Sequence, residues 1–192
     1  MATAGKVRER SFAGLEHMSR DHFAAFGMIV TMTSHLDALF DQIIVAMTES
    51  ANKPAFYPIL TFLSAKDKRD YIQAMARIST WPPYAIDGIM RLMDRAKTVF
   101  SLRNDVAHLV WRKGRKPGTI KPMSLSARSV LNVLGSEHNE REWTAAQLEA
   151  EAHKIHELGL ELARFMDRYG LVALPEKPPP RSRRADKPRS GP

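Results

Sequence analysis

Apolar residues in the first part of the chain recur every three or four positions, the spacing of a helix that buries one face. The clearest series consists of Phe23, Phe26, Val30, Thr33, Leu36, Phe40, Ile43 and Met47. It predicts one long helix over about residues 20–50, with Ser19 as its N-cap and Asp21 in its first turn.

This helix is apolar on more than one side. Four further apolar residues flank the main series, namely Ile29, Met32, Leu39 and Ile44. The wider apolar surface predicts contact with more than one neighbour, and a second subunit is one candidate. His35, Asp37 and Asp41 face elsewhere; they could border the cleft of the Arg103–His108 motif, but we interpret them as solvated polar residues.

Prolines divide the next segment of the chain. Asn52-Lys53-Pro54 ends the first helix, and Pro58 limits the following residues to a short helical turn. Ser64 is then expected to cap a second helix that ends near Ile78. Asp67 lies three residues after Ser64, where a capping box usually has Glu or Gln, and has a shorter side chain than either.

A third helix is predicted over about residues 84–111, after Trp81-Pro82-Pro83 interrupts the chain. Its inner positions are Ile86, Ile89, Met93, Ala96, Phe100, Arg103, Ala107 and Val110. Arg103 is a charged residue on this apolar stripe, and an unpaired buried charge is too costly to keep. We therefore expect Arg103 either to reach a carboxylate across the bundle or to line a cleft between packed subunits.

Helix-breaking residues follow this segment, at Gly114, Pro117, Gly118 and Pro122. Weak alternation over residues 123–133 fits a small hairpin or an irregular loop. Thr144 then caps a last helix that ends at Tyr169-Gly170, with Gly170 at the C′ position. The pattern predicts an all-α fold, a bundle of four to five helices with a small irregular or hairpin insertion before the last helix.

The helical pattern defines one domain over residues 19–170, preceded by a flexible lead-in at residues 1–18. Residues 171–192 are rich in Pro, Arg and Ser, so we predict a disordered basic tail there. Much of the net charge of +8 lies at the ends of the chain, because residues 175–192 hold six Lys or Arg against two acidic residues.

The composition excludes several classes of protein. The chain has no Cys, which rules out disulfides, zinc–thiolate sites and cysteine nucleophiles and is compatible with a reducing cytoplasm. No signal-peptide core begins the chain, and no apolar run approaches the roughly 20 residues that cross a bilayer. We therefore expect a cytoplasmic protein with no membrane segment. Phosphate-binding glycine loops, dinucleotide fingerprints and nucleophile elbows are also missing from the sequence.

No metal or other cofactor is predicted. His153 and His156 lie three positions apart on the last helix and could share a metal ion. No carboxylate-plus-His pattern completes a site around them, so we assign them no metal.

The sharpest candidate site lies at the end of the third helix and consists of Arg103, Asn104 and His108. At about 100° and 1.5 Å per residue, Asn104 and His108 point roughly 40° apart and form one polar spot. Arg103 lies roughly 140° from His108 around the axis, but its long side chain can sweep back toward the imidazole. A guanidinium suits a phosphate oxygen, and an imidazole that titrates near neutrality suits proton transfer. The three residues are therefore candidates for catalysis on a phosphodiester.

Basic residues follow this motif immediately. Residues 112–128 hold six Lys or Arg and no acidic residue. The first four, Arg112, Lys113, Arg115 and Lys116, are the candidate RNA-binding residues, because a basic loop beside a site can guide a polyanion to it.

The motif resembles that of the higher eukaryotes and prokaryotes nucleotide-binding (HEPN) domain family. In that family a polar residue follows an Arg, and four to six residues separate the Arg from a His. Arg103, Asn104 and His108 match with four residues between Arg and His. The resemblance extends over roughly residues 20–169, in the long first helix, a second helix pair and the place of the motif near a helix end. One branch of the family has a Tyr two residues after the His; this chain has Val110 there, which disfavours that branch.

The resemblance implies an all-α domain that is usually dimeric and often a metal-independent ribonuclease of a toxin-like or phage-defence module. The implied partners are RNA, a second copy of the chain and, for a toxin, an antitoxin or regulatory protein. His108 would then act as general base or acid, Arg103 would hold the phosphate, and Asn104 would orient the imidazole or the phosphate.

Two other hypotheses remain open at this point. The first is a non-catalytic helical module that binds nucleotide, RNA or a protein partner, with Arg103 and His108 as binding or structural groups. The second is a plain dimeric scaffold in which Arg103 pairs with a core carboxylate. A structure discriminates between them, because an open basic cleft favours the ribonuclease and a buried Arg103 pair favours the scaffold.

Overall fold

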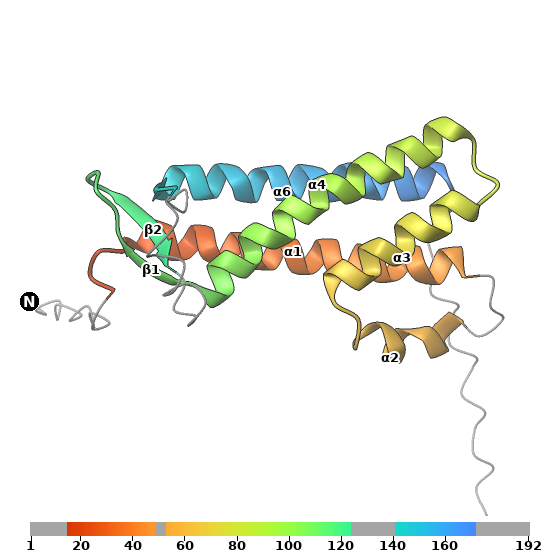
Figure 1. Cartoon of the computed structure of the whole chain (residues 1–192), viewed down its shortest axis with the longest axis horizontal. Coiled ribbons are helices and arrows are strands. Elements are labelled where there is room, and N and C mark those ends of the chain that lie inside the picture. The colour runs from red at the N-terminus through yellow and green to blue at the C-terminus, as the bar shows by residue number, and fades with distance from the viewer. Residues whose placement is uncertain (1–14, 49–52, 124–140, 172–192) are drawn as a thin grey trace, which may run out of the picture.

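The computed structural model describes residues 15–48, 53–123 and 141–171, which form a helical bundle with a small sheet at one end (Figure 1). The bundle consists of α1 (Arg20–Met47), α3 (Ala65–Ile78), α4 (Pro83–His108) and α6 (Ala145–Arg168). The 3-10 helix η1 (Lys53–Phe56) and the short α2 (Tyr57–Leu60) connect α1 to α3. The antiparallel sheet has the order β1 (Val110–Lys113), β2 (Thr119–Met123) and β3 (Trp143–Thr144). The predicted helical bundle with a small insertion before the last helix is confirmed.

The helix α1 packs against α3, α4 and α6. In Figure 1, α6 runs beside α1 in the same direction, and α4 runs back toward the sheet. One buried cluster joins the four helices and includes Phe40, Ile72, Met93 and Leu162. A second cluster lies at the sheet end and includes Ile29, Trp111, Ile120, Trp143 and Ile155. Because both clusters share α1, this helix is the common core element of the bundle.

Part of the wide apolar surface of α1 is covered within its own chain, whereas Phe23, predicted to face inward, is 42% exposed. Ile29 and Ile44 are buried, and Met32 and Leu39 pack against the edges of the two clusters. The expectation of several neighbours is therefore met by α3, α4 and α6, and these residues do not require a second subunit.

By length and composition alone, α1 could cross a bilayer. Its most apolar 18-residue window has a mean hydropathy of 1.4, so the expectation that no segment approaches a membrane span does not hold for this helix. The core helix of a soluble bundle passes the same test, and α1 packs against three other helices here. A cytoplasmic location without a membrane segment stays a prediction.

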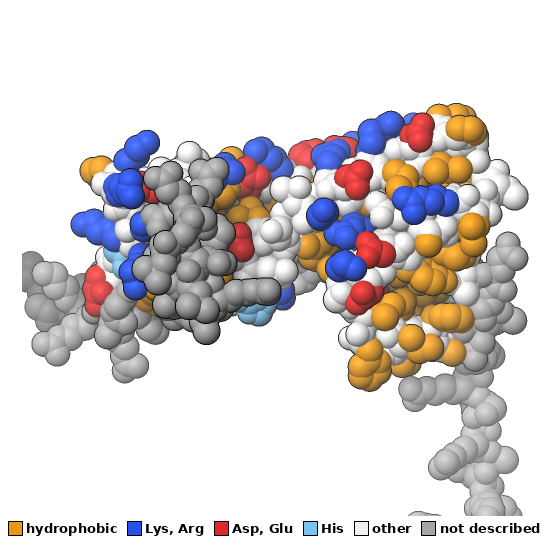
Figure 2. Space-filling model, in the orientation of Figure 1, with side chains coloured by type: hydrophobic (Ala, Val, Ile, Leu, Met, Phe, Trp, Pro, Cys, Tyr) orange, Lys and Arg blue, Asp and Glu red, His pale blue; other side chains and the backbone are white. Residues whose placement is uncertain are grey.

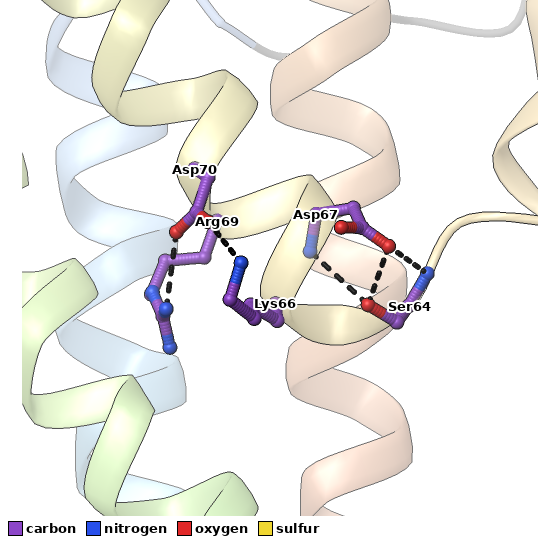
Figure 3. Close-up of polar contacts among 5 residues, drawn as sticks. All are labelled: Ser64, Lys66, Asp67, Arg69 and Asp70. Atoms are coloured by element: carbon purple, nitrogen blue, oxygen red, sulfur yellow. Dashed lines mark hydrogen bonds and ion pairs between the residues drawn. The ribbon is translucent and has the colours of Figure 1, made fainter.

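The helix starts follow their local sequence signals. The Ser64 hydroxyl accepts a hydrogen bond from the Asp67 backbone N–H, and the Asp67 carboxylate accepts one from the Ser64 N–H (Figure 3). The capping box predicted for these two residues is therefore confirmed. Thr144 caps α6 as predicted, and Gly170 follows its end with a φ of +64° that disfavours any residue with a Cβ.

The end of α4 differs from the prediction. The helix ends at His108, and Val110–Lys113 forms a strand that pairs with β2, so Trp111 is buried in the sheet cluster. The hydrogen bonds of the strand and the burial of this indole stabilise the chain more than further helical turns would. Ala107 and Val110, which were predicted to face inward, are exposed. The hairpin thus precedes the predicted place, and residues 124–133 of that prediction lie outside the described residues.

Described residues on either side of the predicted range 19–170 also contact the helical bundle and the sheet. His17 Nε2 lies 2.9 Å from the Trp111 carbonyl oxygen, and Met18 packs against the sheet cluster. Leu171 is buried in the main cluster. Residues 15–18 and Leu171 therefore belong to the folded part, whereas the predicted lead-in at 1–14 and the basic tail at 172–192 lie outside the described residues.

A buried ammonium group connects α1 with α3. Lys68 is only 3% exposed, and its Nζ lies 2.8 Å from Asp37 Oδ2 and 2.7 Å from Asp41 Oδ1. Burial disfavours the charged form of Lys68, but the bonds to the two carboxylates outweigh that effect and raise its pKa. The interpretation of Asp37 and Asp41 as merely solvated residues is therefore wrong.

Lys68→Met is expected to lower the free energy of unfolding by about 2 to 4 kcal/mol, because it leaves two neighbouring carboxylates without a cation. Lys66→Met is the matched control, since Lys66 forms an exposed pair with Asp70 whose loss should change the free energy of unfolding far less. Urea denaturation of both variants measures the difference. Equal stability of the Lys68 variant and the wild type would show that the buried pair does not stabilise the fold.

Candidate functional site

The C-terminal part of α4 lines a cleft of about 730 Å³ together with α1 and the start of α3. Arg103 and Asn104 are among its lining residues, with Phe100 and Ser101 from the same helix. The opposite walls consist of Thr33, Ser34 and Asp37 of α1 and of residues 64–66 and 69 at the start of α3. The structure therefore places two of the three predicted site residues in one concave surface.

The cleft is basic, but only part of its charge is free. Lys66 and Arg69 both bind Asp70, at 2.9 and 3.0 Å, as Figure 3 shows. The lining carboxylate of Asp37 binds the buried Lys68. The two remaining lining cations, Lys97 and Arg103, form no ion pair with any residue that the structure describes. These two side chains are available to an anionic ligand.

Arg103 is half-buried, and its Nη1 donates a hydrogen bond to Asn104 Oδ1 at 3.2 Å. A guanidinium has five N–H groups, so this bond leaves most of its donors for another acceptor. Among the described residues, no carboxylate pairs with Arg103. The pair with a core carboxylate that a plain scaffold would need is therefore not found in that part of the chain.

His108 lies outside the cleft. It is the last residue of α4 and is exposed, and the residues that line the cleft on this helix end at Asn104. Asn104 and His108 remain one helical turn apart on one side of α4, about 6 Å along its axis. One chain thus brings Arg103 and Asn104 together and places the imidazole beyond the edge of their cleft.

The four candidate RNA-binding residues lie on the hairpin. Arg112 and Lys113 belong to β1, and Arg115 and Lys116 belong to the turn before β2; all four are exposed. Figure 2 shows Lys and Arg side chains gathered at this end of the molecule. None of the four lines the cleft, so they form a separate basic surface that follows His108 in the chain.

A carboxylate from a distant part of the chain holds this turn. Glu142 accepts hydrogen bonds from the backbone N–H groups of Arg115 and Lys116, at 2.7 and 3.2 Å, and from the Thr119 hydroxyl at 2.8 Å. These bonds lower the pKa of Glu142. Gly114 is required beside them, because an added Cβ would lie 2.1 Å from Thr119 Oγ1.

The sequence analysis missed three polar residues near the site. Lys68 had a usable signal, since it lies four residues before the buried Ile72 on the inner side of α3. Glu142 had none, because its partners are more than 20 residues away. Burial raises the pKa of the Asp105 carboxyl, which lines a smaller cavity with Arg141. The roles of Glu142 and Asp105 depend on contacts that no local pattern encodes.

Within the described residues, no group of three or more His, Asp or Glu side chains could hold a metal ion. His153 instead lies 3.9 Å from Glu149 on the same helix.

Comparison of the chain with protein-family models, curated proteins and solved structures found no match.

The turn that presents Arg115 and Lys116 is expected to loosen in acid. Because the folded state lowers the pKa of Glu142, the stabilising bonds are complete above its ordinary value of 4.5 and are lost as the pH falls through the folded-state pKa. Amide chemical shifts of Arg115 and Lys116, followed by NMR from neutral to acid pH, report this change. Glu142→Gln removes the titrating group, so an identical transition in that variant would assign the change to another residue.

Proposed function

We propose that this chain is a metal-independent endoribonuclease of the HEPN type that cleaves RNA through its own 2′-hydroxyl group. The main support is the basic cleft in which Arg103 has no carboxylate partner among the described residues. The exposed imidazole of His108 lies one helical turn beyond Asn104. A free guanidinium for phosphate and a group that transfers protons near neutral pH are the parts that this chemistry needs.

The proposed reaction is an internal transesterification. The 2′-oxygen attacks the neighbouring phosphorus, the bond from phosphorus to the 5′-oxygen breaks, and a cyclic phosphate and a 5′-hydroxyl result. Arg103 stabilises the negative charge on the phosphate oxygens, and Asn104 holds the guanidinium or the phosphate by hydrogen bonds. His108 takes the proton of the 2′-hydroxyl or gives one to the leaving 5′-oxygen. DNA lacks the attacking hydroxyl and is not cleaved this way.

The position of His108 makes a second copy of the chain part of this proposal. His108 is exposed at the end of α4 and does not line the cleft of its own chain, and Ala107 and Val110, close to it in the sequence, are also exposed. In a symmetric dimer formed around this helix end, His108 of one protomer would meet Arg103 of the other. The cleft of each protomer would then combine its own Arg103 with the imidazole of the other protomer.

The second candidate function is a non-catalytic module that binds RNA or nucleotide. The placement of His108 outside the cleft favours it, because a binding site needs only Arg103, Asn104 and Lys97. The exposed basic hairpin fits either function. A toxin-like or defence role, with an antitoxin or regulatory protein as partner, rests on the family resemblance alone.

His108→Ala is expected to lower the single-turnover rate of RNA cleavage in EDTA by roughly 10²- to 10⁴-fold, the contribution of a positioned general acid or base. Melting should barely change, because the side chain is exposed. His156→Ala is the matched control, since it removes another exposed imidazole, from α6, and should cleave as the wild type does. Wild-type cleavage by the His108 variant would remove this residue from the mechanism, and RNA binding without cleavage by the wild type would establish the binding module.

Mixing two inactive variants tests the shared cleft. Arg103→Ala and His108→Ala should each be inactive alone, whereas a heterodimer contains one cleft with both native side chains. Mixed after brief denaturation and refolding, the two variants are expected to regain part of the wild-type cleavage rate. Sedimentation of each variant verifies that it is dimeric. Dimers without recovered activity, or an active wild-type monomer, would place the complete site in one chain.

A further inference from the structure

A second basic groove, of about 560 Å³, is lined by residues of α4 and α6. The start of α4 and the end of α6, which contain these residues, lie toward the end of the bundle opposite the sheet (Figure 1). Four arginines and three aromatic residues are among its lining residues. The arginines are Arg91 and Arg95 of α4 and Arg164 and Arg168 of α6. Each pair is four residues apart, so its two side chains project from the same side of their helix, about 6 Å apart along the axis.

Among the residues that the structure describes, one carboxylate lines this groove. Glu161 binds Arg95 through both of its oxygens, at 2.5 and 3.0 Å, and this pair is internally neutral. Arg91, Arg164 and Arg168 are exposed and form no ion pair with a residue of the described segments. The charge of Arg164 also helps to lower the pKa of Glu161, after the larger effect of its bond to Arg95. The groove therefore presents three arginines that form no ion pair within the described residues.

Aromatic rings accompany these arginines. Phe165 and Tyr169 lie with their ring centroids 4.5 Å apart, and Tyr169 stacks on Trp81 at 5.7 Å, which fixes these rings as part of the core edge. Tyr84, at the start of α4, lines the same groove but is 69% exposed. An exposed ring beside free guanidinium groups can accept another flat ring on its face.

We propose that this groove binds single-stranded nucleic acid, with Arg91, Arg164 and Arg168 on the phosphates and Tyr84 stacked on a base. Arginine forms paired hydrogen bonds with phosphate oxygens, and aromatic rings stack on bases of any sequence. This combination favours an oligonucleotide over an acidic peptide, which would use the charges but not the exposed ring.

The groove is separate from the Arg103 cleft. Arg95 and Arg103 are eight residues apart on α4, which is about 12 Å along the axis and about 80° around it. Neither cavity shares a lining residue with the other. Binding of nucleic acid in this groove therefore does not depend on RNA cleavage, and a binding measurement tests it.

The test uses the full chain with the His108→Ala substitution, so that any cleavage is suppressed, and a short fluorescein-labelled oligoadenylate RNA. The triple variant Arg91→Gln, Arg164→Gln and Arg168→Gln is expected to bind at least about tenfold more weakly by fluorescence anisotropy. The slope of log affinity against log salt should fall by about 2, because each single-strand phosphate contact contributes roughly 0.7.

The matched control removes the same charge elsewhere, through Arg20→Gln, Arg77→Gln and Lys154→Gln, which are exposed residues outside the groove. Its affinity should fall by less than about threefold. Equal losses in the two triple variants would overturn the proposal, since they would show only a general effect of net charge.

Tyr84 provides a test that leaves the charge unchanged. Tyr84→Ala is expected to weaken binding about tenfold, whereas Tyr84→Phe keeps the ring and should bind as the wild type does. DNA of the same sequence should bind about as well as RNA, and a polyglutamate peptide far more weakly. Undiminished binding by Tyr84→Ala, or peptide binding equal to RNA binding, would overturn the assignment to nucleic acid.

Discussion

The burial of α1 is the constraint on which the rest of the structure depends. This helix is apolar on several sides, and α3, α4 and α6 all pack on it. Its two ends belong to the two buried clusters of the domain, with Ile29 near the sheet and Phe40 among the four helices. Because α3 and α4 approach α1 from one side, their polar edges enclose the cleft that contains Arg103.

Ion pairs decide which positive charges remain available on this frame. The Asp37 and Asp41 carboxylates are taken by the buried Lys68, and Glu161 is taken by Arg95. With these carboxylates paired, Lys97 and Arg103 in the cleft form no ion pair with a described residue, and neither do Arg91, Arg164 and Arg168 in the groove. The net charge of +8 is therefore a weaker guide to ligands than the local pairing.

Local signals were enough to predict the helices and the general fold. Ser64 and Thr144 cap helices where expected, because a capping box needs only residues three positions apart. The end of α4 was missed, since Trp111 enters a strand paired with residues beyond a turn. The convergence of Arg103 and Asn104 in one cleft follows from helix packing, and the exclusion of His108 depends on where α4 ends. Contacts between residues far apart in the sequence determine the shape of this cleft and the end of α4. The apolar pattern of a single helix does not predict such contacts.

The central claim is that the Arg103 cleft and His108 act on RNA through the 2′-hydroxyl. The most direct measurement is mass spectrometry of the products after the wild-type protein is incubated with single-stranded RNA in EDTA. Transesterification predicts fragments that end in a 2′,3′-cyclic phosphate and begin with a 5′-hydroxyl, and a 2′-deoxy substitution should block the cut at its position. Fragments with a 3′-hydroxyl and a 5′-phosphate, or RNA that is bound and stays intact, would contradict this claim.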